Sequence, residues 1–231
     1  MKKFYDKTEL NIPYHTNDQK QFYLKRCAEF DKAQIGYDKI VFLGDSITEG
    51  GGNWNNYFGT KNIVNRGISG DTTIGVLTRL HEIWFYKPIS LFLLIGINDI
   101  FSTDSPNRKN ITPLSVSNNI ITIAKMIYKK SPNTQVYIQT TLPINTKLYK
   151  ETFGTFPVHK MPLPDQINHI NTRLKKNESQ NHYTVIDLHD IFLDGRGLLS
   201  KKHTSDGVHL NEEGYNKWSN FIKNYISSNF L

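Results

Sequence analysis

Apolar residues follow two alternating patterns along the chain. Five short runs are rich in β-branched and aromatic residues: 39–43, 62–65, 89–95, 135–139 and 182–186. Runs of this length and composition predict strands. The run 89–95 is almost wholly apolar, which predicts a central strand that is covered on both faces.

Between these runs, apolar residues recur every three or four positions, as on one side of a helix. This spacing predicts helices over 17–35, 73–85, 113–130 and 165–178, and a last helix capped by Asn211. Thr112 followed by Pro113 is typical of a helix start. Alternating strands and helices predict an α/β fold with a parallel sheet between two helical layers. We expect an N-terminal extension with one helix, 1–36, packed on one domain, 37–231.

Two loops carry residues suited to nucleophilic chemistry. Right-handed crossovers place strand-to-helix loops at the carboxyl edge of a parallel sheet, where ligands bind. Gly44, Asp45 and Ser46 directly follow the first predicted strand, so a serine hydroxyl stands on a rigid element beside a small neighbour. Asp206 stands three residues before His209, just ahead of the last predicted helix. A carboxylate in that position can fix the tautomer of the imidazole and stabilise its charged form.

Two further loops carry candidate donors for a developing negative charge. In 67–73, two glycines three residues apart leave backbone amides accessible at a helix start, and Gly70 is the second of them. In 96–99, Asn98 follows the most apolar strand, and its amide can donate to an oxyanion. Each loop also has a plain structural interpretation as a turn or a helix cap.

Residue patterns alone leave alternatives for the other two loops. Asp45 can simply cap a helix by accepting from backbone amides. Asp206 and His209 can mark a helix entry or half of a metal site. His203 and the pair of Asp187 and His189 would be further ligands, but no His-Glu or Cys-x-x-Cys spacing supports a metal.

In their order along the chain, these motifs resemble the SGNH/GDSL hydrolase family over residues 40–214. The resemblance implies a flavodoxin-like, three-layer αβα sandwich with five parallel strands in the order 2-1-3-4-5. It implies a serine esterase with an acyl-enzyme intermediate, in which Ser46 is the nucleophile, His209 the general base and acid, and Asp206 its orienting partner. The oxyanion hole would consist of the backbone N–H groups of Ser46 and Gly70 and the side chain of Asn98. Neither a metal nor an organic cofactor is expected.

The Gly-Asp-Thr-Thr sequence that begins at Gly70 resembles the branch with platelet-activating-factor acetylhydrolase subunits and bacterial carbohydrate acetylesterases. This resemblance implies a small-molecule ester substrate, such as an acetylated sugar. The alternatives are a lysophospholipase or thioesterase, an acetyltransferase with the same triad, and a non-catalytic carbohydrate-binding domain. Asp45 and Trp54 are candidate substrate contacts, with packing as the alternative for Trp54. Residues 141–165 are predicted to form a long connection that either shapes the pocket or is an irregular surface lid.

Composition narrows the class of partner. The 28 Lys and Arg against 21 Asp and Glu give a net charge of +7, but the lysines are scattered in pairs, which argues against nucleic acid. No apolar run approaches the length of a membrane span. Cys27 is the single cysteine, so no internal disulfide can form. The start MKKFYDKTEL lacks the apolar part of a signal peptide, as in a cytoplasmic protein, although a trimmed periplasmic or secreted chain would begin the same way. The pattern leaves the oligomeric state open.

Overall fold

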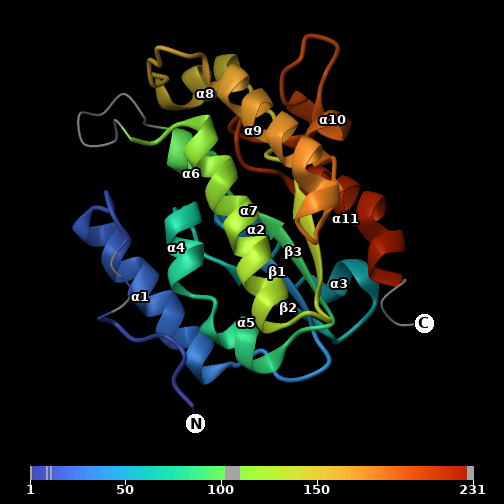
Figure 1. The fold of residues 1–231 in the computed structure, drawn as a ribbon. Coiled ribbons are helices and arrows are strands. Elements are labelled where there is room, and N and C mark those ends of the chain that lie inside the picture. The colour runs from blue at the N-terminus through green and yellow to red at the C-terminus, as the bar shows by residue number, and fades with distance from the viewer. Residues whose placement is uncertain (1, 9, 11, 102–109, 228–231) are drawn as a thin grey trace.

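The strands form a five-stranded parallel sheet, seen in Figure 1. The computed structural model describes residues 2–8, 10, 12–101 and 110–227. The strands are β1 (Ile40–Gly44), β2 (Ile63–Gly67), β3 (Ser90–Leu94), β4 (Gln135–Gln139) and β5 (Thr184–Ile186). They lie in the order β2-β1-β3-β4-β5, and every neighbouring pair is parallel. The predicted sheet and strand order are confirmed.

The two central strands, β1 and β3, are buried along their whole length. Phe42 of β1 stacks on Phe92 of β3 with ring centroids 5.0 Å apart. The central place predicted for 89–95 is therefore confirmed. Strand β5 starts two residues later than predicted, because His182 has a left-handed φ of 57°, which does not continue a strand.

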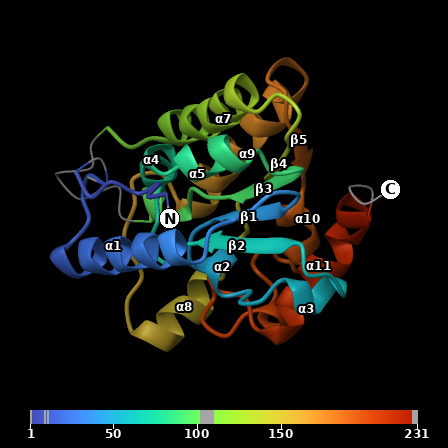
Figure 2. The same cartoon turned by 90° about the horizontal axis from the view of Figure 1, so that it is seen from below.

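Helices cover both faces of the sheet (Figure 2). One face carries α4 (Thr73–Thr78), α5 (His81–Tyr86), α7 (Pro113–Lys130) and α9 (Leu163–Asn177); the other carries α3 (Asn55–Phe58) and α11 (Glu212–Ser227). Shorter elements are α2 (Ser46–Glu49), α6 (Ile97–Ile100), α10 (Leu188–Phe192) and the 3₁₀ helices η2 (Glu178–Gln180) and η3 (Lys201–His203). The predicted αβα sandwich is confirmed. Among the described residues, no helix combines the length and apolar character that crossing a bilayer requires.

The single helix predicted over 73–85 is wrong. Helix α4 ends at Thr78 because Arg79 leaves helical geometry, with φ −121° and ψ 28°. The Arg79 guanidinium is buried, and it donates to the carbonyl oxygens of Arg66 at 2.8 Å and Gly44 at 3.0 Å. The apolar spacing on either side of this residue is helical, so the periodicity does not reveal the break.

The connection over 141–165 is not an irregular lid in its first half. Residues 141–145 are buried, and helix α8 (Thr146–Phe153) follows, with the Asn145 side chain accepting from the Leu148 amide. The Asn145 amide donates to the Gly207 carbonyl oxygen at 2.8 Å. This connection therefore packs against the loop that carries Asp206 and His209.

The N-terminal segment and α1 (Asn17–Lys32) form a second apolar cluster beside α4 and the β2 edge of the sheet (Figures 1 and 2). Its members are Phe4, Tyr5, Leu10, Ile12, Tyr23, Cys27, Phe30 and Ile68. Helix α1 begins where predicted, behind the N-cap Thr16, and ends three residues early.

A buried carboxylate joins this cluster to the sheet. Glu82 of α5 accepts from the Tyr5 hydroxyl at 2.5 Å and the Ile35 amide at 2.7 Å. It also pairs with Arg66 of β2 at 2.8 Å. One acidic side chain thus bonds to the N-terminal segment, to the loop that follows α1 and to the edge strand β2.

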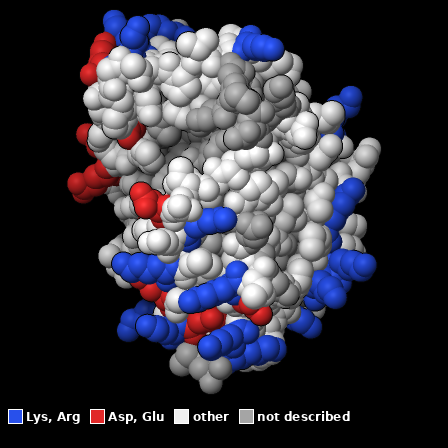
Figure 3. Space-filling model, turned by 90° about the vertical axis from the view of Figure 1, so that its left-hand side faces the viewer, with Lys and Arg blue, Asp and Glu red and all other residues white. Residues whose placement is uncertain are grey.

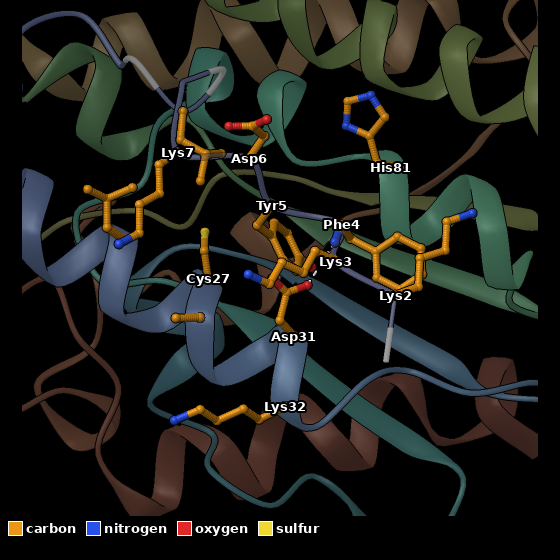
Figure 4. A pocket seen from close by; sticks show the side chains of 13 residues that line it. Lys2, Lys3, Phe4, Tyr5, Asp6, Lys7, Cys27, Asp31, Lys32 and His81 are labelled. Carbon is orange, nitrogen blue, oxygen red and sulfur yellow. Dashed lines mark hydrogen bonds between the residues drawn. The ribbon is translucent and has the colours of Figure 1, made fainter.

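A hollow of about 950 Å³ lies between the N-terminal segment and α1 (Figure 4). Its lining includes Lys3, Lys7, Cys27 and Lys32, and the Phe4 amide crosses it to donate to Asp31 at 2.8 Å. Figure 3 shows the side of the molecule at the left of Figure 1, where Lys and Arg are interspersed with Asp and Glu. No residue of the Ser46, Asp206 and His209 set lines the hollow.

Candidate active site

Ser46, His209 and Asp206 meet, although 163 residues separate the serine from the histidine. Ser46 is the first residue of α2, directly after β1. Its Oγ lies 3.0 Å from His209 Nε2, and His209 Nδ1 lies 2.7 Å from Asp206 Oδ2. The hydroxyl, imidazole and carboxylate are therefore connected in a line by hydrogen bonds, as the sequence motifs predict.

The loop of Asp206 and His209 is held by its own backbone. Asp206 Oδ1 accepts from the amides of Val208 and His209, each at 2.8 Å. Gly207 has φ +90°, and a Cβ there would lie 2.4 Å from the Asn145 carbonyl oxygen, so only glycine fits. Partial burial alone would raise the pKa of Asp206, but the hydrogen bonds from the His209 ring and the two amides outweigh it and lower that pKa. Asp206 is therefore an anion at neutral pH.

The turn before Ser46 needs a glycine and a buried cap. A Cβ on Gly44 would lie 2.3 Å from the Leu94 carbonyl oxygen. Asp45 is 1% exposed, and its Oδ1 accepts from the Ile47 amide at 3.0 Å, which caps the helix that begins with Ser46. Burial raises the pKa of Asp45 to about 7. The candidate substrate contact at Asp45 is wrong because its side chain faces the interior.

Trp54 is also not a substrate contact. It is 1% exposed and stacks on Phe42 with centroids 4.4 Å apart, while Trp218 of α11 meets its edge at 4.8 Å. Its indole N–H donates to the Thr48 carbonyl oxygen at 3.1 Å. With both faces buried, the ring has no surface on which a sugar can stack.

Gly70 and Asn98, the other two predicted oxyanion residues, lie on adjoining loops. The Asp71 amide donates to the Ile68 carbonyl oxygen at 3.0 Å and closes a tight turn, in which Gly70 has φ +79°. Asn98, in the first turn of α6, donates from Nδ2 to the Asp71 carbonyl oxygen at 2.9 Å. This bond fixes the plane of the Asn98 amide relative to the Gly70 turn.

A buried ionic group below these loops escaped the sequence analysis. Arg79 pairs with Asp71 at 2.7 Å, and both side chains are buried. Asp99 accepts from the Thr73 amide at 2.9 Å and the Thr73 hydroxyl at 2.6 Å, and burial raises the pKa of Asp99 to about 6. A charged residue beside the apolar stripe of 73–85 was the one available signal for this group.

The candidate metal ligands do not converge. Among the residues that the structure describes, no three His, Cys, Asp or Glu side chains are placed to hold a metal ion. Asp187 instead pairs with Lys175 and accepts from the Thr140 hydroxyl at 2.9 Å. The chemistry that this arrangement can support is attack by the Ser46 hydroxyl with proton transfer to His209, which is how hydrolases activate a serine.

Comparisons with known proteins identify the family and the fold. Rat platelet-activating factor acetylhydrolase IB subunit alpha2 is 26% identical over 186 residues, which cover 77% of this chain and 71% of that protein. A GDSL-like lipase of Bacteroides thetaiotaomicron has the same fold, with a TM-score of 0.73 and 22% identity over 89% of this chain and 97% of that one. The acetyl xylan esterase AlAXEase has a TM-score of 0.64 and 20% identity, over 81% and 99%. The model of the GDSL-like lipase/acylhydrolase family matches residues 42–217. The chain belongs to this family and is thereby a carboxylic ester hydrolase.

Proposed function

We propose that this protein hydrolyses short-chain acyl esters of carbohydrates, most simply acetyl esters, through an acyl-enzyme on Ser46. The observation that carries the proposal is the hydrogen-bonded line from Ser46 through His209 to Asp206. In such a line the histidine takes the proton of the hydroxyl, and the carboxylate stabilises the imidazolium that results.

The first half of the reaction transfers the acyl group to the enzyme. Ser46 Oγ attacks the ester carbonyl carbon while His209 Nε2 takes its proton. The tetrahedral intermediate collapses when the C–O bond to the alcohol breaks, and His209 returns the proton to the leaving oxygen. In the second half, water attacks the acyl-enzyme with the same proton transfers and releases the carboxylic acid.

The negative charge of the tetrahedral oxygen needs donors in place before the reaction. We assign this role to the backbone N–H groups of Ser46 and Gly70 and to the Asn98 side chain. Their support is structural. The Ser46 amide lies at the start of a capped helix. The Asn98 side chain donates to the carbonyl oxygen of Asp71, the residue after Gly70, so the Asn98 amide and the Gly70 N–H are held near each other.

The choice of acetyl esters rests on the similar proteins, because both the rat relative and the xylan esterase are named for acetyl esters. Exposure of the site supports a bulky alcohol. The His209 side chain is 48% exposed, so the reacting atoms lie near the surface and a sugar ring can stay in solvent.

The test is hydrolysis of p-nitrophenyl acetate, butyrate and octanoate by the wild type, Ser46→Ala and Asn98→Ala. We expect Ser46→Ala to lose at least about 10³-fold in kcat, and Asn98→Ala about 10²- to 10³-fold with little change in KM. More than a tenth of the wild-type rate in Ser46→Ala contradicts the nucleophile assignment.

Acyl length and product identity then test the substrate. A steep fall in kcat/KM from acetate to octanoate, followed by acetate release from acetylated xylo-oligosaccharides, supports the proposal. A rate that rises with acyl length indicates a lysophospholipase or thioesterase. Acetylated sugar formed from p-nitrophenyl acetate and a free sugar, in place of acetate, indicates a transferase.

A further inference from the structure

The segment before the family match reaches the oxyanion loop. The family model begins at residue 42. Upstream of it, His15 contacts the Gly70 carbonyl oxygen, and Arg26 pairs with Glu49, which in turn accepts from Ser69. We treat residues 1–36 as an extension packed on the domain 37–231. The contacts of this extension with the loop are specific enough to assign it a part in the reaction.

The geometry of the loop makes one peptide group decisive. The Ile68–Asp71 turn is closed by a 3.0 Å hydrogen bond, and φ of +79° at Gly70 matches the third position of a type II turn. Type I and type II turns differ by a rotation of the central peptide group of about 180°. Here the central peptide joins Ser69 to Gly70 and carries the Gly70 N–H. Its rotation decides whether that N–H can serve an oxyanion.

The peptide group before the central one, between Ile68 and Ser69, is held by Glu49. Glu49 Oε2 accepts from the Ser69 amide at 2.7 Å and from the Ser69 hydroxyl at 2.6 Å. Glu49 Oε1 pairs with Arg26 Nε of α1 at 2.8 Å. Helix α1 therefore orients the carboxylate that fixes Ser69.

The peptide group after the central one, between Gly70 and Asp71, is held by His15. Its Nε2 lies 3.3 Å from the Gly70 carbonyl oxygen, within reach of an N–H donor on the ring. The His15 ring meets the edge of Tyr23, and the Tyr23 hydroxyl donates to the Gly75 carbonyl oxygen of α4 at 2.9 Å. The histidine is thus supported by a tyrosine that docks on the helix following the loop.

The start of the turn is anchored in the same cluster. Ile68 is fully buried, and its cluster contains Ile12, Tyr23 and Cys27 from the extension. Residues 68, 69 and 70 are therefore held by contacts that the extension makes directly or through Glu49.

We propose that His15 and Arg26 are positioning residues for the oxyanion hole. They hold the Ser69–Gly70 peptide in the rotation that presents the Gly70 N–H to the substrate oxygen. The inference rests on the proposed function, because it concerns the same intermediate. Neither residue touches the reacting atoms, so each acts through the turn.

The test compares His15→Ala, His15→Gln and Arg26→Gln with the wild type on p-nitrophenyl acetate and butyrate. We expect His15→Ala to lower kcat about 10-fold for both esters with KM within about twofold, because the oxyanion is common to all esters. His15→Gln keeps an N–H donor and should recover most of the rate. Arg26→Gln should lower kcat about threefold to tenfold, since Glu49 keeps its bonds to Ser69.

His169→Ala is the matched control, because His169 is an exposed histidine on α9 that takes no part in the contacts described for residues 68–70. Thermal melting shows which variants are folded at the assay temperature, and where His15→Ala is not, His15→Gln and Arg26→Gln decide. Unchanged kcat in the folded variants overturns the inference, as does a loss that differs between acetate and butyrate. Ser46→Ala in the same assay separates the two proposals: an inactive Ser46→Ala with a fully active His15→Ala removes the inference alone.

Discussion

The two sides of the site each contain an acidic residue paired with a basic one, and the two pairs differ in their exposure to solvent. On one side, Asp206 and His209 form a pair whose histidine is half exposed. On the other, Arg79 and Asp71 form a pair with almost no exposed surface. In the proposed reaction, the first pair has to reach substrate and exchange protons. The second pair is closed to solvent. Removing either partner of a buried pair strongly destabilises the fold, because it leaves the other charge buried and uncompensated.

The buried side works mainly through backbone groups. Arg79 donates to the carbonyl oxygens of Gly44 and Arg66, at the carboxyl ends of β1 and β2. Its partner Asp71 also accepts from the Thr72 amide at 2.8 Å. One cation thus ties together the ends of two strands and the Gly70 turn. The difference between the two sides suggests that substitutions on the exposed side alter rate and those on the buried side alter stability.

Asp206→Asn should break the exposed side with the largest effect. An amide cannot stabilise the imidazolium as a carboxylate does, so we expect kcat to fall about 10³- to 10⁴-fold. The free energy of unfolding should change by less than about 1 kcal/mol, because the pair is partly exposed. Ester hydrolysis and urea unfolding measure the two quantities. A loss of rate below tenfold would contradict the role given to this carboxylate.

Arg79→Met should break the buried side. The change leaves Asp71 without its partner and removes the guanidinium donors to the Arg66 and Gly44 carbonyl oxygens, so the free energy of unfolding should fall by about 3–5 kcal/mol. Arg196→Met is the matched control, since Arg196 forms an exposed pair with Asp194 and its loss should cost less than about 1 kcal/mol. Urea unfolding compares them. Equal losses in the two variants would remove the distinction between the sides.

Asp45→Asn should sharpen the comparison with a smaller effect. Burial raises the pKa of Asp45 from 3.8 to about 7, so the folded state holds a proton that the unfolded state releases. The stability of the wild type should therefore fall as pH rises from about 4 to about 7. Asparagine can still accept from the Ile47 amide and carries no charge.

The quantity to measure is the melting temperature of both proteins at pH 5 and pH 8. The free energy of unfolding of Asp45→Asn relative to the wild type should rise from pH 5 to pH 8 by about 1–2 kcal/mol. In a chain of this size this corresponds to about 3–6 °C in melting temperature. A difference that stays constant with pH would mean that Asp45 is ionised in the folded state throughout.

Sequence patterns predicted the parallel sheet and placed the loops of Ser46 and His209 at one edge of it, because these depend on local signals. The strand order came from the family resemblance. A short apolar run predicts a strand, and the topology then fixes which loops share an edge. The break at Arg79 could not be predicted in this way, because the guanidinium bonds to the Gly44 carbonyl oxygen, which is distant in sequence and comes close only after folding. For Asp45 the sequence left a helix cap and a substrate contact open, and the burial of its side chain decides for the cap.

Trp54 shows the same limit from another direction. An aromatic residue after a glycine-rich turn suits a sugar platform as well as a core position, and its composition and spacing do not distinguish the two. The outcome was decided by Phe42 and Trp218, which enclose the ring from β1 and α11. The sequence left two interpretations of the 141–165 connection open for a similar reason, since the cap that starts α8 is a buried asparagine.

Glu82 gives the N-terminal extension a further significance. Release of that extension would strip this interior acceptor of the Tyr5 and Ile35 donors, and the penalty would fall on the sheet edge that remains. Opening the extension would therefore cost more than the loss of its apolar cluster alone. The extension and the β2 edge thus share one buried carboxylate, although the family match begins between them at residue 42.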